Sequence, residues 1–386
     1  MAKPGKSINS FYYPSLDGLR FFAFFLVFLH HSLFNLSSNN QVINFFLVII
    51  EKNGWVGVDL FFVLSGFLIT SLLIRERRVY GRYSLKNFWI RRSLRIWPLY
   101  YLALIMGFFV IPYFYSLLGW QNFSDPKYNL QRISQLPLYL TFLGNWSVVF
   151  SSYSAFANIS HLWTISLEEQ FYLVWPLVLL FIINFRRTLL AGMGILMMSI
   201  GTRLFMALNM AKHPAVYTNT LARMDTLALG AILALIFFYK PEYLRKLSWL
   251  TNPVALVSSL IIFLLFLHRI FVFNPRPLQN IIFGYPIIGL FMVYFVFTSL
   301  NPNILFTKIL SFPLFVWLGK ISYGLYVWHL LALDLGNRFL TNCPLAIKVF
   351  VSLLITITIS TISYYLFEAK FLRLKQLFTK IASRSV

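Results

Sequence analysis

Acidic residues and cysteine are scarce in this sequence. Of its 386 residues, 11 are Asp or Glu against 33 Lys or Arg, and only 11% are charged, whereas 59% are hydrophobic. The single cysteine, Cys343, excludes an internal disulfide bond, so cysteine content gives no indication of the redox compartment. A composition so apolar and so poor in charge is typical of a helical membrane protein.

Several kinds of segment are also missing. The opening stretch MAKPGKSINSFYYPS lacks the apolar core and cleavage site of a secretory signal, so we expect the first apolar run to remain as a helix. We find no low-complexity linker, no convincing short-period repeat and no appended soluble domain, and the connection 118–161 is polar and aromatic. No groove-reading or single-strand-binding module accompanies the basic clusters, which argues against a nucleic-acid partner.

Apolar runs of about twenty residues recur along the chain, each long enough to cross the roughly 30 Å of a bilayer core. They predict an all-α polytopic membrane protein with about ten transmembrane helices. The predicted spans are 15–36, 54–75, 96–117, 162–184, 188–210, 220–240, 250–270, 279–300, 312–334 and 345–368. We expect three parts: an N-terminal tail over 1–11, a transmembrane domain over 12–370 and a basic C-terminal tail over 371–386.

Basic residues mark alternate connections between these spans. The richest connection holds Arg75, Arg77, Arg78, Arg82, Lys86, Arg91, Arg92 and Arg95. If the chain crosses the membrane ten times, all the basic connections and both tails lie on the same side of it. The positive-inside rule makes this side cytoplasmic. The net charge of +22 is therefore mostly a topology signal, because such residues normally meet anionic lipid head groups.

Ionisable residues within the spans require an explanation, because inserting such a side chain at a helix centre costs about 2.5–3.5 kcal/mol. In LDGLRFFAFFLVFLHH, Arg20 and His31 are eleven positions apart. That spacing returns to nearly one helical face and separates the two residues by about 16 Å along the axis. His30 is turned about 100° from this stripe, so we interpret it as a structural residue.

Other polar residues lie in similar settings. Asp59 follows the start of GWVGVDLFFVLSGFLIT, and HLWTISLEEQFYLVWP places His161, Glu168 and Tyr172 on one helical stripe. ARMDTLALG contains Arg223 and Asp225, and SYGLYVWH ends at His329. Depth along the spans assigns these residues to two sets. The outer half receives His31, Asp59, Glu168, Asp225 and His329, and the inner face receives Arg20, Arg92 and Arg95.

Simpler explanations exist for some of these residues. Asp59, Asp225 and His329 lie near span ends, where a polar side chain can cap a helix or reach the interface. On composition alone, Arg92 and Arg95 are more typical of topology anchors than of a ligand site. The spacing of His213 and His268 fits no metal motif, so we expect no metal site.

Taken in order, these motifs resemble the acyltransferase-3 family of integral membrane O-acyltransferases. The resemblance rests on Arg20 to His31, GVDLFFVLSGFLIT, RRSLRIWPLYY, HLWTISLEEQFYLVWP, ARMDTLALG and LGKISYGLYVWH, and it covers about residues 12–370. It implies an enzyme that moves an acyl group, usually acetyl, from cytoplasmic acyl-CoA to a hydroxyl of a carbohydrate, such as a surface polysaccharide or a lipid-linked glycan. It also implies the bacterial cytoplasmic membrane, no permanently bound cofactor, and acyl-CoA as donor substrate. Some relatives carry an extracytoplasmic hydrolase-like domain, for which this sequence has no room.

The resemblance assigns roles to the polar residues. His31 would take a proton from the attacking hydroxyl or receive the acyl group transiently, with Asp59 or Glu168 as its acid partner, and the sequence does not choose between the two acids. Arg20, Arg92 and Arg95 would bind CoA phosphates, for which a guanidinium fork is suited. The expected acceptor side consists of Tyr172, Arg223, Asp225, His329 and His161.

A transporter or flippase is the alternative, because carriers also place ionisable residues in the membrane as a relay. Inverted repeats or paired Gly/Pro-interrupted spans would favour a carrier, and none is clear in this sequence. The sequence does not indicate the oligomeric state.

Overall fold

The computed structural model describes residues 12–33, 41–119, 126–151, 158–181, 184–209, 213–269 and 280–379. Throughout these ranges the chain forms helices and turns and no strand. The all-α fold predicted from the sequence is therefore confirmed. In chain order the α-helices are α1 (Pro14–Ser32), α2 (Gln41–Asn53), α3 (Val56–Tyr80), α4 (Leu85–Ile105), α5 (Ile111–Leu117), α6 (Pro126–Leu140), α7 (Gly144–Ser151), α8 (Trp163–Phe181), α9 (Phe185–Leu208), α10 (His213–Thr218), α11 (Thr220–Tyr239), α12 (Pro241–Lys246), α13 (Pro253–Leu267), α14 (Tyr285–Ser299), α15 (Leu305–Leu310), α16 (Pro313–Lys320), α17 (Ser322–Phe339), α18 (Leu345–Ser363) and α19 (Ala369–Gln376).

Short 3-10 and π-helical turns join some of these helices. The 3-10 turns are η2 (Ser160–Leu162) and η3 (Ser248–Thr251), and the π turns are η1 (Met106–Val110), η5 (Asn280–Gly284) and η6 (Tyr364–Glu368). Through η1, helices α4 and α5 form one segment of 33 residues, and through η6 the last helices form one segment of 32 residues.

Each predicted span corresponds to a helix or a pair of helices. By length and apolarity, seven segments of the described chain could cross a membrane, or eight if the bent pair α16–α17 is one span. The other two predicted spans are α1, which carries Asp17 and Arg20, and α13, which has 15 residues. The protein is thus an integral membrane protein, while a count of ten spans and the location of the termini stay predictions.

The structure corrects two of the predicted boundaries. The span predicted over 312–334 is broken into α16 and α17, which are bent by 74°. Gly319 next to this break lies against the backbone of Asp17, and a side chain there would collide with it. The span predicted to begin at 96 begins at Leu85, where Ser84 caps α4 by accepting from the Asn87 amide at 3.2 Å. The arginines that follow therefore lie within a helix.

Helices α3 and α11 form the interior of the bundle. The apolar window of α3 is 83% buried and that of α11 is 72% buried, against 17% for α9 and for α18. The two helices meet at Gly66, which faces the Leu227 carbonyl, and at Gly230, which faces the Val63 carbonyl. Small residues allow such close backbone contact, which is the usual basis of helix association in membranes.

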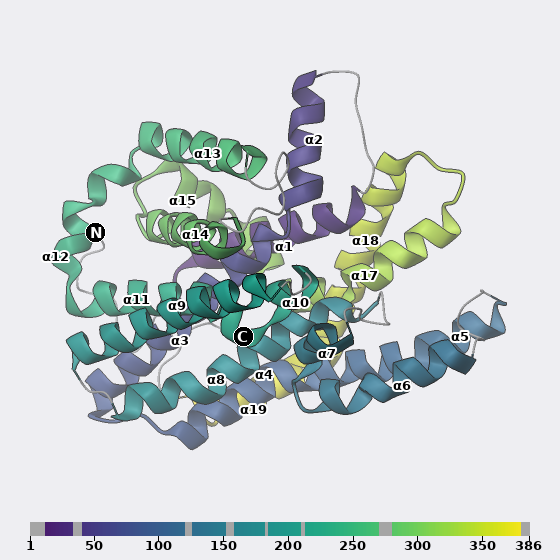
Figure 1. The fold of residues 1–386 in the computed structure, drawn as a ribbon, viewed down its shortest axis with the longest axis horizontal. Helices are drawn as coiled ribbons and strands as arrows, with labels where there is room; N and C mark the ends of the chain where they lie inside the picture. The colour runs from purple at the N-terminus through teal and green to yellow at the C-terminus, as the bar shows by residue number, and fades with distance from the viewer. Residues whose placement is uncertain are drawn as a thin grey trace.

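Helix α1 runs through the middle of the assembly. It packs against α3, α16 and α17, and also against α2, α14 and α15. In Figure 1, α13, α14 and α15 lie on one side of α1 and α17 and α18 lie on the other, while α2 projects from the top of the view. Helix α1, which carries Arg20 and His31, therefore contacts α3, which carries Asp59, and α17, which carries His329.

Candidate active site

Three histidines from distant parts of the chain meet at one end of α1. The Nδ1 atom of His31 lies 3.1 Å from Nε2 of His329 on α17, and the rings of His329 and His161 are 4.8 Å apart. His329 and His161 are buried at 0% and 4% exposure, whereas His31 is exposed. The cluster therefore has one histidine that a substrate can reach and two that support it from behind.

The hydrogen bonds fix the tautomers of the neutral rings. His329 Nδ1 lies 2.6 Å from the Tyr326 carbonyl, which can only accept, so this nitrogen carries the proton. Nε2 of His329 is then an acceptor and takes the hydrogen bond from Nδ1–H of His31. The lone pair of His31 Nε2 is left available, as a general base or a nucleophile requires.

His30 has a different environment. Its Nδ1 donates to the Glu51 carbonyl at 2.5 Å and ties α1 to α2, while its ring lies 5.1 Å from that of His31. A histidine held in this way joins two helices, and the geometry supports the structural interpretation of His30.

A cavity of about 100 Å³ lies between α1, α3, α4, α8 and α17. Three of its lining residues are Arg20, Arg92 and Arg95, to which the family resemblance assigned the CoA phosphates. Along α8 its wall includes Thr164, Glu168 and Tyr172, which extend over about 12 Å of helix axis. A pocket for a whole drug-sized ligand typically measures about 300–1,000 Å³, so this cavity suits a narrow chain rather than a nucleotide.

Glu168 belongs to this cavity. Its carboxylate accepts from the Ser65 hydroxyl at 2.7 Å, and Ser65 in turn lies 2.9 Å from the Tyr172 hydroxyl. Ser65 therefore joins Glu168 and Tyr172 in one hydrogen-bonded group. Glu168 therefore lies with the arginines rather than with the histidines, although depth along the spans had assigned it to the outer set.

The arginines of RRSLRIWP differ in their contacts. Arg91 is 5% exposed, pairs with Glu76 at 2.6 Å and donates to the Phe378 carbonyl at 2.8 Å. Arg92 instead lies over the rings of Phe88 and Tyr172, at 5.7 Å from each centroid. Among the described residues no carboxylate lies within 4.0 Å of the Arg92 or Arg95 guanidinium. Arg91 thus has a structural role, while Arg92 and Arg95 remain available to an anionic ligand.

Arg20 lies on the same cavity and makes one ion pair, with Asp17 at 3.1 Å one turn earlier on α1. Lys375 of α19 lies close enough to Arg95, Arg92, Arg91 and Arg20 for the positive charges to repel one another. Helix α19 packs along α4, which brings Lys375 into this group. The sequence analysis missed this contribution, because Lys375 lies in a segment predicted to be a tail.

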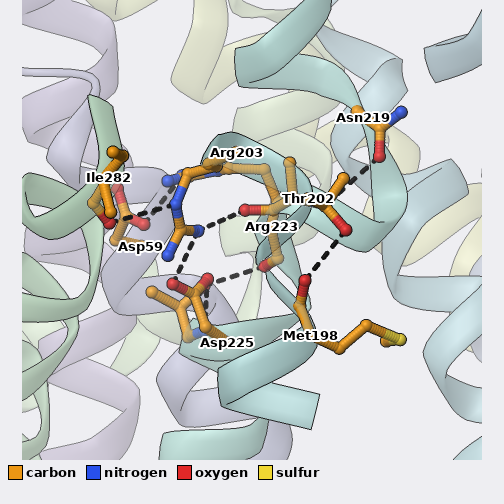
Figure 2. A network of polar contacts seen from close by, with 10 residues as sticks. Asp59, Met198, Thr202, Arg203, Asn219, Arg223, Asp225 and Ile282 are labelled. Atoms are coloured by element: carbon orange, nitrogen blue, oxygen red, sulfur yellow. Dashed lines mark hydrogen bonds and ion pairs between the residues drawn. The ribbon is translucent and has the colours of Figure 1, made fainter. Parts of the chain in front are cut away.

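Asp59, Arg223 and Asp225 form a separate cluster with Arg203, which Figure 2 shows. Arg223 pairs with Asp59 at 2.7 Å and Arg203 pairs with Asp225 at 2.8 Å, and all four side chains are fully buried. Arg203 also donates to the carbonyls of Ala222 and Ile282, and Arg223 lies 4.4 Å from the ring centroid of Tyr285. The cluster joins α3, α9, α11 and η5, and the sequence analysis missed Arg203.

The predicted site residues therefore divide into three groups. His31, His329 and His161 form the histidine cluster, and Arg20, Arg92, Arg95, Glu168 and Tyr172 line the cavity. Asp59, Arg223 and Asp225 belong to the buried ion pairs. Neither Asp59 nor Glu168 contacts His31, whose side-chain hydrogen-bond partner is His329. The stripe predicted from His161 through Tyr172 is interrupted because His161 lies in the 3-10 turn η2, before α8 begins.

Tyr326 and Thr164 separate the cavity from the histidines. Both residues line the cavity, and their hydroxyl groups lie 2.9 Å apart. Tyr326 also donates to the His161 carbonyl at 3.2 Å, and its own carbonyl holds His329. The end of the cavity away from the arginines is thus in contact with the histidine cluster. Within the described part of the chain, no group of His, Cys, Asp and Glu residues could hold a metal ion.

Comparison with known proteins identifies the family. A family model described as an acyltransferase domain, that of the acyltransferase-3 family, matches residues 13–365. A provisionally named O-acetyltransferase of Staphylococcus aureus strain COL is 29% identical over 373 residues, which cover 93% of this chain and 57% of that protein. The O-acetyltransferase OatA of Staphylococcus aureus strain NCTC 8325 is 29% identical over 371 residues, which cover 92% of this chain and 57% of OatA.

The chain thus spans 57% of the length of these curated relatives. No solved structure matches it. The family match extends over nearly all of the described helices and over all three groups of site residues. The chain therefore belongs to the acyltransferase-3 family of integral membrane proteins, as the sequence motifs indicated.

Proposed function

We propose that this protein is a membrane O-acyltransferase that moves an acyl group, acetyl in the first instance, from cytoplasmic acyl-CoA to a hydroxyl of a carbohydrate. One observation carries the proposal: a narrow cavity with three arginines in its wall is bounded by Tyr326, whose carbonyl holds His329, and His329 in turn accepts from His31 and leaves the Nε2 lone pair of His31 available. The names of the two staphylococcal relatives support acetyl as the group transferred. The acceptor is a surface polysaccharide or a lipid-linked glycan, and the membrane is the bacterial cytoplasmic membrane.

In this proposal Arg20, Arg92 and Arg95 bind the donor phosphates. Guanidinium groups bind phosphate oxygens through paired, charge-assisted hydrogen bonds, and Arg92 and Arg95 are not neutralised by a neighbouring carboxylate. The adenine nucleotide stays outside the cavity, because about 100 Å³ has room only for part of the pantetheine arm. The thioester then reaches the Tyr326 end of the cavity, beside the histidines.

His31 acts on the acceptor. Its Nε2 takes the proton of the hydroxyl as the oxygen attacks the thioester carbonyl; the C–S bond breaks, and CoA leaves as the thiolate, to which the proton is returned. His329 fills the orienting role for which Asp59 and Glu168 were considered, because it holds His31 Nδ1–H at 3.1 Å. We assign positioning roles to both acids: Glu168 holds Ser65 and Tyr172, and Asp59 holds Arg223.

The remaining predicted residues have supporting roles. His161 lies behind His329, and Tyr172 borders the cavity beside Arg92. Arg223 and Asp225 act indirectly, since both are fully buried in ion pairs that join three helices.

The test is acyl transfer by the purified protein in lipid nanodiscs. The protein is incubated with radiolabelled acetyl-CoA and a panel of glycans, and both labelled glycan and free CoA are measured, with the His31→Ala variant as control. A carrier needs two compartments and cannot produce a covalent product in a nanodisc, so labelled glycan supports the enzyme. Release of CoA at the same rate from wild type and variant, with no labelled glycan, would contradict the proposal.

A further inference from the structure

A second hollow, of about 270 Å³, lies on the other side of α1, between α1, α2, α13, α14 and α15. Its wall is formed by apolar side chains such as Leu19, Leu26, Phe263 and Met292. Asn53 is the single polar side chain among the residues that line it. We refer to this hollow as the apolar groove. A hollow with such a wall holds hydrocarbon in preference to water.

Asn53 is the feature that points to a particular kind of ligand. The residue is only 1% exposed, and neither its amide nitrogen nor its amide oxygen has a hydrogen-bond partner. A buried polar group without a partner costs stability, and both atoms of one amide are affected here. A ligand that places a polar group beside Asn53 and an apolar chain along the groove would satisfy both features.

Helices α1 and α3 separate the apolar groove from the arginine cavity. On α1, Leu19 and Leu26 face the groove, whereas Arg20 faces the cavity. On α3, Val56 and Leu60 line the groove, whereas Phe61 and Ser65 line the cavity. One ligand can therefore occupy each side of this two-helix wall at the same time.

The apolar groove approaches the histidine cluster at the C-terminal end of α1. Gly54 lines the groove next to Asn53, and a side chain at Gly54 would meet Leu26 and the Cβ atom of His30. The His30 ring is 5.1 Å from that of His31. The polar end of the groove is therefore one histidine ring away from the proposed base.

We propose that the apolar groove binds the hydrocarbon chain of the lipid that carries the acceptor, with Asn53 hydrogen-bonded to the polar group that links chain and sugar. This proposal rests on the proposed function, and it selects a lipid-linked acceptor over a free polysaccharide. The chain lies along α13 and α14, and the sugar passes His30 to reach His31. Donor and acceptor thus approach His31 from opposite sides of the wall formed by α1 and α3.

The kinetic test compares methyl, octyl and dodecyl glycosides of a sugar that accepts the acetyl group in nanodiscs. We expect KM to fall at least tenfold from the methyl to the dodecyl glycoside in the wild type. Leu264→Trp fills the groove from α13. It should abolish this fall in KM while leaving kcat for the methyl glycoside unchanged. Leu265→Trp is the matched control, because Leu265 is 55% exposed on the same helix and does not line the groove.

Asn53→Leu provides a second test, in which the protein should keep or gain stability while its binding of the dodecyl glycoside weakens. Replacing an unpaired buried amide with an apolar side chain of similar size should leave the melting temperature unchanged or raise it. The same change should raise KM for the dodecyl glycoside several-fold. A melting temperature that falls markedly, with KM unaltered, would show that Asn53 supports the fold and does not bind a ligand.

A binding test separates this inference from the proposed function. A dodecyl glycoside with a diazirine at the chain end should label peptides of α2 and α13 in the wild type but not in Leu264→Trp, whether or not the protein transfers acetyl. Labelling by a diazirine phospholipid that the glycoside does not displace would assign the groove to bulk lipid and overturn the inference. Acetyl transfer with equal KM for methyl and dodecyl glycosides would also overturn it, and would leave the proposed function intact.

Discussion

His329 lies 3.1 Å from His31, although 298 positions separate the two residues in the chain. The contact brings α17 against the end of α1 and gives His31 a defined tautomer. It replaces the carboxylate partner that the sequence suggested. The consequences for activity can be measured residue by residue.

His31→Ala should remove most acetyl transfer, by a factor of about 10²–10⁴, because general-base catalysis typically contributes that much. Folded yield should change little, since His31 lies exposed at the end of its helix. His30→Ala should retain much of the activity, because His30 bonds to the Glu51 carbonyl and not to the reacting groups. The measurement is the transfer rate of each variant at matched protein concentration, and equal rates for wild type and His31→Ala would refute the assignment.

His329→Phe should lower kcat by about tenfold or more, because His31 then loses the acceptor that orients its ring. His329→Gln keeps an oxygen that can accept from His31 Nδ1–H and should recover part of the rate. The measurement is kcat and its pH profile for both variants. Identical losses in the two variants, without a change in the pH profile, would indicate a packing role for His329.

Arg92→Lys and Arg95→Lys should each weaken acyl-CoA binding by about 1–3 kcal/mol, on the order of tenfold or more, because lysine lacks the planar fork. Arg78→Lys is the control, because it makes the same change of side chain away from the cavity. Arg78 donates to the Phe238 carbonyl at 2.6 Å. Donor affinity and the apparent KM are measured in all three. Unchanged donor affinity in the Arg92 and Arg95 variants, with orientation verified, would make them topology anchors.

Lys375→Gln should weaken donor binding several-fold, and more strongly at low salt, because it removes a positive charge beside Arg92 and Arg95. Lys370→Gln is the matched control, since Lys370 lies exposed on the same helix. Donor affinity is measured at two ionic strengths. If the two variants behave alike, the effect belongs to the overall charge of α19 and not to the cavity.

Asp59→Ala should destabilise the protein by about 3–5 kcal/mol, because it leaves the Arg223 charge buried without its partner. The double variant Asp59→Leu with Arg223→Met removes both charges and should recover much of that stability. Thermal unfolding in detergent measures both effects. A folded Asp59→Ala protein with an unchanged melting temperature and no activity would instead place Asp59 in the chemistry.

The sequence determined which segments are helical and apolar, because hydropathy and helical periodicity are local properties of the chain. Within the described residues, each of the ten predicted apolar runs corresponds to a helix or a pair of helices, and the stripe from Arg20 to His31 follows from their spacing within one helix. The ordered motifs also identified the family. These features need no knowledge of which helices are neighbours.

Only the tertiary structure decided the partners of the polar residues. Arg91, Arg92 and Arg95 are alike in sequence, yet Arg91 is paired with Glu76 while the other two line the cavity. Asp59 and Glu168 were equal candidates to assist His31. The packing of α11 against α3 pairs Asp59 with Arg223, and the packing of α8 against α3 places Glu168 beside Ser65. A buried charge is stabilised by whichever opposite charge or donor the neighbouring helices bring to it. For Asp59 and Glu168 that partner lies more than a hundred positions away in the chain, so only the packing of the helices decides it.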